Sequence, residues 1–221
     1  LRFHAIYWPA FLLAAKIKPP NRVFSHGWIM SGEEKMSKSK GNILNPLEII
    51  NKYGVDELRY YLMKEVSHGN DGSVSLKRLE NCINSDLANN YGNLCQRVFA
   101  FIKNNCKNRV IKTKDISVAD NKLIKQTKEL TGDLKSLMDN QNLNNYIKSI
   151  INISFLTNKY INDEEPWKLK KNNIEKMNNI LHITLEQIAK ISILLNPIIP
   201  KASEKVLNAL NIRSELKNFS F

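Results

Sequence analysis

The chain contains 221 residues, 43% of them hydrophobic and 24% charged, which is typical of one large or two ordinary globular domains with a buried core. No run approaches the roughly 18 apolar residues of a membrane-spanning helix, so we expect no membrane association, and three cysteines without a CxxC pair argue against a disulfide framework or a metal site and favour a reducing compartment. The net charge of +12 favours polyanionic partners, although charge alone leaves nucleic-acid binding and an ordinary lysine-rich surface equally open.

The first 45 residues combine helix, strand and loop. We predict a short helix at residues 3–15, a turn at 18–21, an extended run at 22–30 that includes His26-Gly27-Trp28, and a polar loop at 31–42. That order is typical of the end of an α/β domain. Because the chain opens inside an apolar pattern, we also expect further sequence upstream.

From Asp56 onward, apolar residues recur with the helical period of 3.6. Asp56 is a candidate N-cap for the first of these helices, and Pro197 and Pro200 end the fifth. The predicted helices cover residues 57–66, 75–106, 120–138, 143–155, 174–191 and 202–210. Successive amphipathic helices with short polar links predict an antiparallel bundle, so the fold is expected to be mainly α.

The loop at residues 31–42 carries the candidate chemistry. It has a glycine near each end, Gly32 and Gly41, and the string KMSKS at residues 35–39 between them. Glycine hinges allow such a loop to move, and alternating lysine and serine side chains offer ammonium charges and hydroxyl donors to a polyphosphate. An ordinary exposed loop can have the same composition, so the composition alone does not decide.

The string KMSKS, with Gly-Asn shortly after it, resembles the signature loop of the class I aminoacyl-tRNA synthetases. The resemblance implies a Rossmann-type catalytic domain that uses ATP with Mg²⁺ to activate an amino acid, and lysines that stabilise the charge on the departing pyrophosphate. It implies Lys38 first and Lys35 second as catalytic residues and ATP contacts, together with the hydroxyls of Ser37 and Ser39. Lys40 lies outside the motif and is expected to meet solvent or RNA backbone.

A stretch at the start of the chain resembles the methionyl enzymes of that class. Residues 1–12 are similar to the helix that forms one wall of the methionine pocket, and His4 and Trp8, one helical turn apart, project from one face. A polarizable thioether suits an aromatic wall, although an aromatic stripe at this spacing is on its own more often core than pocket. The resemblance implies His4 and Trp8 as methionine contacts, with Tyr7 as a third.

Two further stretches resemble the anticodon site of the methionyl enzymes. Asn93 and Arg97 are one turn apart within residues 85–97, and an amide and a guanidinium can both make bidentate hydrogen bonds to base edges. Trp167 follows Pro166 at an expected helix start, where an indole can stack on a base. A solvated helix face and a half-buried structural tryptophan are the alternatives. The resemblance implies that all three residues contact the anticodon of tRNA(Met).

The resemblance as a whole implies a methionine–tRNA ligase. It divides the chain into the distal piece of a Rossmann-type α/β catalytic domain (1–45), a connecting stem-contact region (46–78) and an α-helical anticodon-binding bundle (79–221). Methionine, ATP and tRNA(Met) are the implied partners of a monomeric, cytoplasmic enzyme. The HIGH motif and any structural Zn²⁺ should lie upstream, so we expect this chain alone to be catalytically inactive.

Two alternatives remain at this point. Another class I synthetase, of the leucine or cysteine type, would also contain KMSKS, and a non-catalytic RNA-binding module could retain the loop. The agreement of three separate stretches with the methionyl enzymes favours the methionine–tRNA ligase interpretation over these two alternatives.

Overall fold

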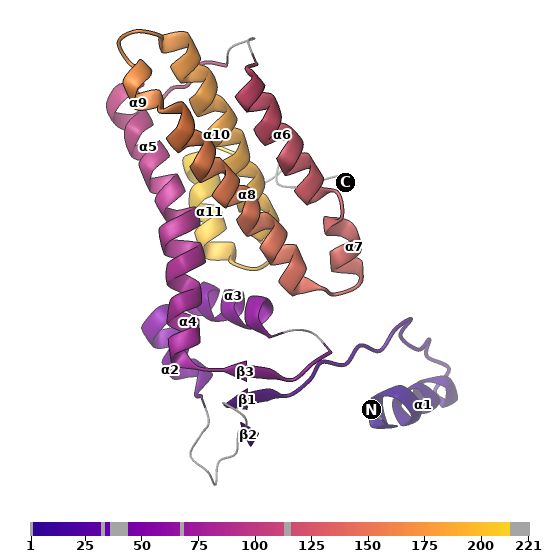
Figure 1. The fold of residues 1–221 in the computed structure, drawn as a ribbon. Helices are drawn as coiled ribbons and strands as arrows, with labels where there is room; N and C mark the ends of the chain where they lie inside the picture. The colour runs from indigo at the N-terminus through magenta and orange to yellow at the C-terminus, as the bar shows by residue number, and fades with distance from the viewer. Residues whose placement is uncertain (1, 32–33, 36–43, 67–68, 113–115, 213–221) are drawn as a thin grey trace.

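The computed structural model describes residues 2–31, 34–35, 44–66, 69–112 and 116–212. Figure 1 shows a bundle of long helices standing on a small sheet, with the N-terminal helix off to one side at the end of an extended segment. Among the described residues no helix is both long and apolar enough to cross a membrane.

The sheet has three short strands in the order β2-β1-β3 (Figure 1). They are β1 (Ile29–Ser31), β2 (Glu34–Lys35) and β3 (Gly72–Val74). β1 pairs with β2 antiparallel and with β3 parallel, with Met30 opposite both Lys35 and Ser73. β3 was not predicted from the sequence.

The run predicted as extended at residues 22–30 is extended (Figure 1), but only its last two residues belong to a strand. The ladder ends at Trp28, whose carbonyl accepts from Gly72 N at 2.8 Å while its N–H donates to the side chain of Asp71 at 2.7 Å. The preceding glycine allows this close approach, because a Cβ on Gly27 would lie 2.1 Å from the carbonyl oxygen of Asn70.

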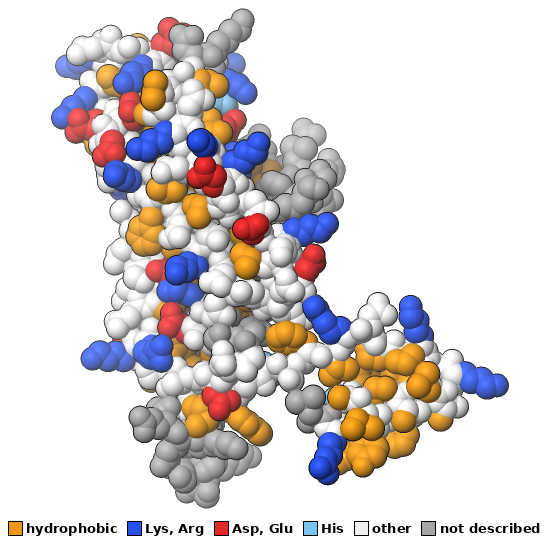
Figure 2. Space-filling view, turned by 45° about the vertical axis from the view of Figure 1, so that its right-hand side comes forward, with side chains coloured by type: hydrophobic (Ala, Val, Ile, Leu, Met, Phe, Trp, Pro, Cys, Tyr) orange, Lys and Arg blue, Asp and Glu red, His pale blue; other side chains and the backbone are white. Residues whose placement is uncertain are grey.

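The predicted N-terminal helix is confirmed as a π-helical turn, η1 (Phe3–Tyr7), that continues as α1 (Trp8–Ala14). Neither element has a buried residue. Figure 2 shows apolar side chains gathered over this part of the molecule, and the most exposed are Phe3 at 75% and Phe11 at 70%. A helix that is apolar on most sides is normally buried inside a protein. The exposed apolar surface of η1 and α1 therefore needs a covering partner.

Two helices, α2 (Pro46–Tyr53) and α3 (Val55–Glu65), connect the loop region with the bundle. Asn45 caps α2 and accepts from Leu47 N at 3.0 Å. The prediction that Asp56 caps the next helix is wrong, because Asp56 lies inside α3, which begins at Val55 after Gly54. The Asp56 carboxylate is buried and instead accepts from Ala202 N at 2.8 Å, in the first turn of a helix 146 residues away.

The helical run predicted at residues 75–106 is confirmed as one continuous rod. It consists of α4 (Leu76–Cys82), the π-helix η3 (Ile83–Gly92) and α5 (Asn93–Asn105), and Ser75 caps it by accepting from Arg78 N at 3.2 Å. The π-helical middle was not predicted. At 1.5 Å per residue, the 30 residues of the rod carry the chain about 45 Å from the sheet to the far end of the bundle (Figure 1).

The other bundle helices are α6 (Val118–Thr131), α7 (Leu134–Asp139), α8 (Leu143–Glu164), α9 (Pro166–Leu169), α10 (Ile174–Leu195) and α11 (Pro200–Ala209). The predicted single helix at 120–138 is two helices, because the chain turns at Gly132 and Asp133. The helices predicted at residues 143–155, 174–191 and 202–210 are confirmed, although α8 continues nine residues past its predicted end. Leu94, Ile147, Ile150, Leu181 and Ile188 are fully buried, so the core lies between the rod, α8 and α10.

Both cysteines of the rod are core residues, as their apolar neighbours in the sequence predict. Cys82 and Cys95 are free thiols and buried. Burial raises the pKa of each thiol to about 12, so both stay protonated at neutral pH and behave as small apolar side chains.

Candidate nucleic-acid interface

Arg97 and Trp167 lie against each other although 70 residues separate them in the sequence. The guanidinium carbon of Arg97 lies 5.7 Å from the centre of the Trp167 ring, within cation–π range. Arg97 is on α5, and Trp167 is on the short α9, which lies beside α5 at one end of the bundle (Figure 1). Trp167 keeps 39% of its surface exposed, which leaves ring area for a stacked ligand.

The turn between α8 and α9 determines where the Trp167 ring lies. Glu165 adopts a left-handed conformation, with φ of 44°. It is the C-terminal cap of α8 and also the residue that precedes α9. Pro166 then occupies the first position of α9, where its fixed φ suits a helix start, and its ring is buried. The sequence prediction that Trp167 follows a proline at a helix start is confirmed.

Asn162, a residue that the sequence did not single out, completes this site. The Arg97 Nη2 donates a hydrogen bond to the Asn162 Oδ1 at 2.8 Å. Asn162 lies in the last turn of α8, five residues before Trp167. Asn93 is exposed one turn before Arg97 on α5. An amide, a guanidinium and an indole thus present hydrogen-bond donors, acceptors and a stacking face on one surface.

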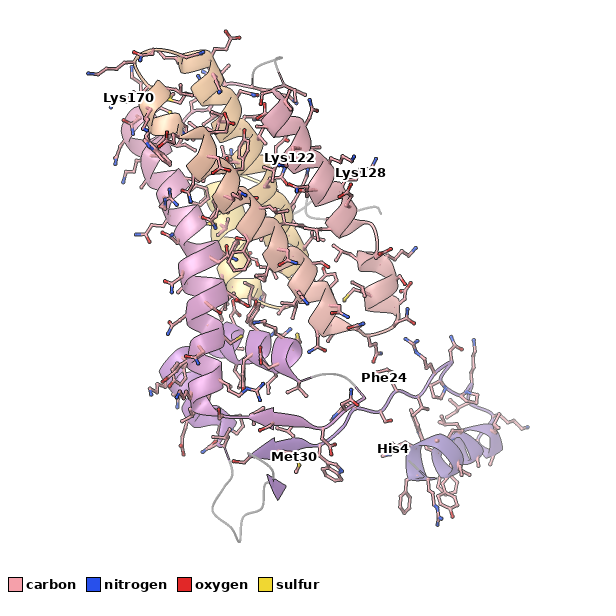
Figure 3. The ribbon with its side chains drawn as sticks, in the orientation of Figure 1. His4, Phe24, Met30, Lys122, Lys128 and Lys170 are labelled. Carbon is pink, nitrogen blue, oxygen red and sulfur yellow. The ribbon has the colours of Figure 1, made fainter. Side chains whose placement is uncertain are left out.

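Basic side chains adjoin this surface. Lys170 directly follows α9, and its Nζ donates to the Asn105 Oδ1 on α5 at 2.7 Å, so a second polar contact joins the same two elements. Figure 3 shows Lys170 at the end of the bundle that carries α9, and Lys122 and Lys128 on α6, across the bundle. Lys168 pairs with Glu165 at 2.7 Å on the exposed side of α9.

His4 and Trp8 form the other predicted cluster. Their ring centres are 6.3 Å apart with the planes at 71°, an edge-to-face arrangement. Both side chains are exposed, and so is Tyr7. The prediction that His4 and Trp8 share one face is confirmed. Their helix lies away from the bundle and beyond the sheet, where Figure 3 labels His4.

The residues that flank the lysine- and serine-rich segment are described. Lys35 is the last residue of β2, and the capping residue Asn45 leads into α2. The other predicted loop residues, Ser37, Lys38, Ser39 and Lys40, lie outside the described residues. Lys35 and Asn45, the described residues on either side of this segment, lie at the sheet end of the molecule, and the rod leads from there toward Arg97 and Trp167 (Figure 1).

Two family models match almost the whole chain between them. Residues 1–99 match "tRNA synthetases class I (M)", and residues 110–218 match the "Anticodon binding domain of methionyl tRNA ligase". This chain belongs to the methionyl-tRNA synthetase family. The fold prediction is thereby confirmed: a distal piece of the class I catalytic domain precedes a helical anticodon-binding domain.

Members of the methionyl-tRNA synthetase family with similar sequences come from several bacteria. The chain is 39% identical over 219 residues to the methionine–tRNA ligase of Brucella suis biovar 1 (strain 1330) and 40% identical over 222 residues to that of Rickettsia felis (strain ATCC VR-1525 / URRWXCal2). These alignments cover 99% of this chain but 42% and 43% of the two relatives. The chain thus spans less than half of the length of the curated relatives it matches.

A solved structure of the methionyl-tRNA synthetase family has the same fold. The Mycobacterium tuberculosis enzyme in complex with methionyl-adenylate superposes with a TM-score of 0.91 at 35% identity, over 98% of this chain and 43% of that one. The two family matches end and begin on either side of position 105, where α5 ends. Arg97 lies in the first match and Trp167 in the second, so their contact joins the two parts of the family's architecture.

Proposed function

We propose that this chain is part of a methionine–tRNA ligase that converts methionine and ATP into methionyl-adenylate and then transfers methionine to tRNA(Met). The single observation that carries the proposal is the contact between Arg97 and Trp167, which brings together two of the three predicted anticodon residues. Family membership and the methionyl-adenylate in the Mycobacterium tuberculosis structure support it. We propose a monomeric enzyme of the cytoplasm, divided into regions 1–45, 46–78 and 79–221.

The proposed reaction starts with attack of the methionine carboxylate on the α-phosphorus of ATP, which expels pyrophosphate. Mg²⁺ enters with ATP as part of the substrate. Negative charge grows on the departing phosphates, and lysine ammonium groups that bind those phosphates in the transition state accelerate the step. In this proposal Lys38 and Lys35 supply the charge, and Ser37 and Ser39 supply hydroxyl donors.

The amino-acid side of the reaction takes place near the N-terminal helix. We propose that the edge-to-face rings of His4 and Trp8 form an apolar, polarizable wall for the methionine thioether, with Tyr7 beside them. The exposure of all three side chains agrees with a wall that other parts of a complete enzyme would cover.

Anticodon recognition takes place far along the rod, where Arg97 lies 21 residues beyond Leu76, about 30 Å at 1.5 Å per residue. We propose that the ring of Trp167 stacks on one anticodon base and that Arg97 and Asn93 bind base edges. The hydrogen bond to Asn162 and the Trp167 ring hold the Arg97 guanidinium in place before RNA arrives, which lowers the conformational entropy lost on binding.

Replacing Trp167 with alanine is expected to weaken binding of an RNA stem-loop with the methionine anticodon by about 10- to 100-fold, because a stacked base contributes roughly 1–3 kcal/mol. Fluorescence anisotropy of a labelled stem-loop measures the change. Trp8→Ala is the matched control, since Trp8 is similarly exposed, at 44% against 39%, but lies on α1. Equal affinity of Trp167→Ala and the unmodified chain would contradict the proposed function.

Lys170→Ala is expected to reduce the salt dependence of stem-loop binding, with the slope of log K against log salt falling by about 0.7–0.9 for one lost phosphate contact. Lys128→Ala, across the bundle on α6, should leave the slope unchanged (Figure 3). Asn105→Ala removes the hydrogen-bond partner of Lys170 but keeps the ammonium, so it should also leave the slope unchanged. If Asn105→Ala lowers the slope as much as Lys170→Ala does, Lys170 acts through the position of α9.

A further inference from the structure

Asn90 places a buried amide between the rod and α8. Its side chain is 3% exposed, and its Oδ1 accepts from Ser154 Oγ at 2.8 Å and from Asn158 Nδ2 at 2.9 Å. Its Nδ2 donates to the Ile151 carbonyl at 3.4 Å. Burying an amide costs free energy unless it is hydrogen-bonded. Both the oxygen and the nitrogen of the Asn90 amide therefore have hydrogen-bond partners.

The cluster of Asn90, Ser154 and Asn158 lies beside the anticodon residues on the same two elements. Arg97 follows Asn90 by seven residues, about 10 Å along the rod, and Asn162 follows Asn158 by one turn of α8. The hydrogen bond between Arg97 and Asn162 is therefore the next polar contact along the interface after the Asn90 cluster.

The apolar contacts of this interface do not define its register by themselves. Leucine and isoleucine side chains pack in more than one axial register, whereas a buried polar pair is satisfied in only one. A slip of one helical turn moves a helix by about 5.4 Å. Such a slip would break both hydrogen bonds to the Asn90 Oδ1 and would separate Arg97 from Asn162.

The position of Trp167 depends on the same register. α9 follows α8 after the single residue Glu165, so a shift of α8 carries Trp167 with it, while Arg97 moves with the rod. The distance between the guanidinium and the indole thus reports how the rod and α8 are aligned.

We propose that Asn90 is a positioning residue for anticodon recognition: its hydrogen bonds to Ser154 and Asn158 fix the axial register of the rod against α8 and so fix the spacing of Arg97 and Trp167. This inference rests on the proposed function, because it assigns a role to Asn90 within the same RNA site. Asn90 need not touch the RNA.

The test uses the full chain and three variants. Asn90→Leu removes the amide. Asn90→Asp keeps an acceptor for both Ser154 and Asn158, but it replaces the donor to the Ile151 carbonyl with a second oxygen and buries a charge, so it should lower stability while keeping these two hydrogen bonds. The all-apolar variant Asn90→Leu/Ser154→Ala/Asn158→Leu leaves no polar side chain of the cluster, so it should unfold at a urea concentration equal to or above that of the unmodified chain.

Discrimination is measured as the Kd for a stem-loop whose first anticodon base is changed, divided by the Kd for the stem-loop with the methionine anticodon. We expect this ratio to fall about tenfold in the all-apolar variant, because base-specific contacts need Arg97 in one place. Asn90→Asp should keep the ratio of the unmodified chain. Stability without discrimination is an outcome that a purely structural role for Asn90 would not produce.

Two results would overturn the inference. One is an all-apolar variant that folds and discriminates as the unmodified chain does. The other is a folded Asn90→Asp variant that loses discrimination as completely as Asn90→Leu. If the unmodified chain shows no preference between the two stem-loops, the proposed function itself fails, and the role of Asn90 fails with it.

Discussion

Replacing Lys38 with alanine, in a complete protein that carries this chain, is expected to slow methionyl-adenylate formation by about 10²- to 10³-fold, the usual cost of losing one preorganised charge-stabilising group. The ammonium interacts with phosphate charge that grows as pyrophosphate departs. Its loss should therefore lower kcat more than it raises the KM for ATP. Pyrophosphate exchange, measured over a range of ATP concentrations, separates the two effects.

The same loop provides the controls for Lys38. Lys40→Ala removes an identical side chain two residues away, outside the KMSKS motif, and should change the rate less than Lys38→Ala does. Lys35→Ala, at the end of β2, should fall between the two. A Lys38→Ala protein that exchanges pyrophosphate at the unmodified rate would contradict the proposed catalytic role, and equal losses at Lys38 and Lys40 would indicate a general charge effect instead.

Helices with an apolar stripe were predictable from the sequence because their periodicity depends on local spacing. The rod, α8, α10 and α11 all appear where that period predicts them. β3 was not predictable in this way, since a three-residue strand has no measurable period and forms only because β1 lies beside it. Likewise, nothing local indicates that Asp56 binds the backbone of α11 instead of capping α3.

The residues of the candidate site differ in the same way: some could be named from the sequence, and others only from the structure. Trp167, Arg97 and Asn93 could be named because their stretches of sequence resemble the methionyl enzymes, whereas the place of Trp167 after Pro166 and the one-turn spacing of Asn93 and Arg97 do not decide it alone. Asn162 and Asn90 could not be named from the sequence, because each matters through a partner on another helix. Polar residues such as Asn90 and Ser154 at positions that the apolar period assigns to the interior were the available signal, and their pairing requires the tertiary structure.

A second buried polar cluster lies at the foot of the rod, where it meets α3. The Asp86 Oδ2 lies 2.7 Å from Lys64 Nζ and also accepts from Tyr60 OH at 2.7 Å, while its Oδ1 accepts from Ser85 Oγ at 2.8 Å. Asp86 is 5% exposed. These contacts attach α3, which follows the loop region, to the rod that carries the anticodon residues.

The ionisation of Asp86 follows from these contacts. Burial pushes the pKa of the carboxyl up, but the hydrogen bonds from Lys64, Tyr60 and Ser85 together lower it below its usual value. For the Lys64 ammonium the signs are reversed. Burial lowers its pKa, and the neighbouring Asp86, Cys82 and Glu65 raise that pKa by more. The structure therefore holds a carboxylate and an ammonium as a charged pair at neutral pH.

Asp86→Asn is expected to lower the free energy of unfolding by about 2–4 kcal/mol at pH 7, because it removes one partner of a buried pair and leaves the Lys64 ammonium without its closest counter-ion. Urea unfolding, followed by circular dichroism, measures the change. Asp133→Asn is the matched control: Asp133 is exposed and makes no capping bond, so it should stay within about 0.5 kcal/mol of the unmodified chain.

The pH dependence identifies the charge of Asp86 as the cause. Since the folded-state pKa lies below the unfolded value, near 3.9, the stabilisation by Asp86 is fully present above about pH 4–5 and is lost as pH falls through the folded pKa. The gap in stability between the unmodified chain and Asp86→Asn should therefore narrow below about pH 4. The pKa of Asp120 is lowered as well, because hydrogen bonds from Tyr160, Ser117 and Asn179 outweigh the effect of burial. Protonation of Asp120 at low pH destabilises both proteins alike, so its contribution cancels in the difference between them. A gap that stays constant from pH 7 to pH 3 would show that Asp86 stabilises the junction by shape and hydrogen bonding, without its charge.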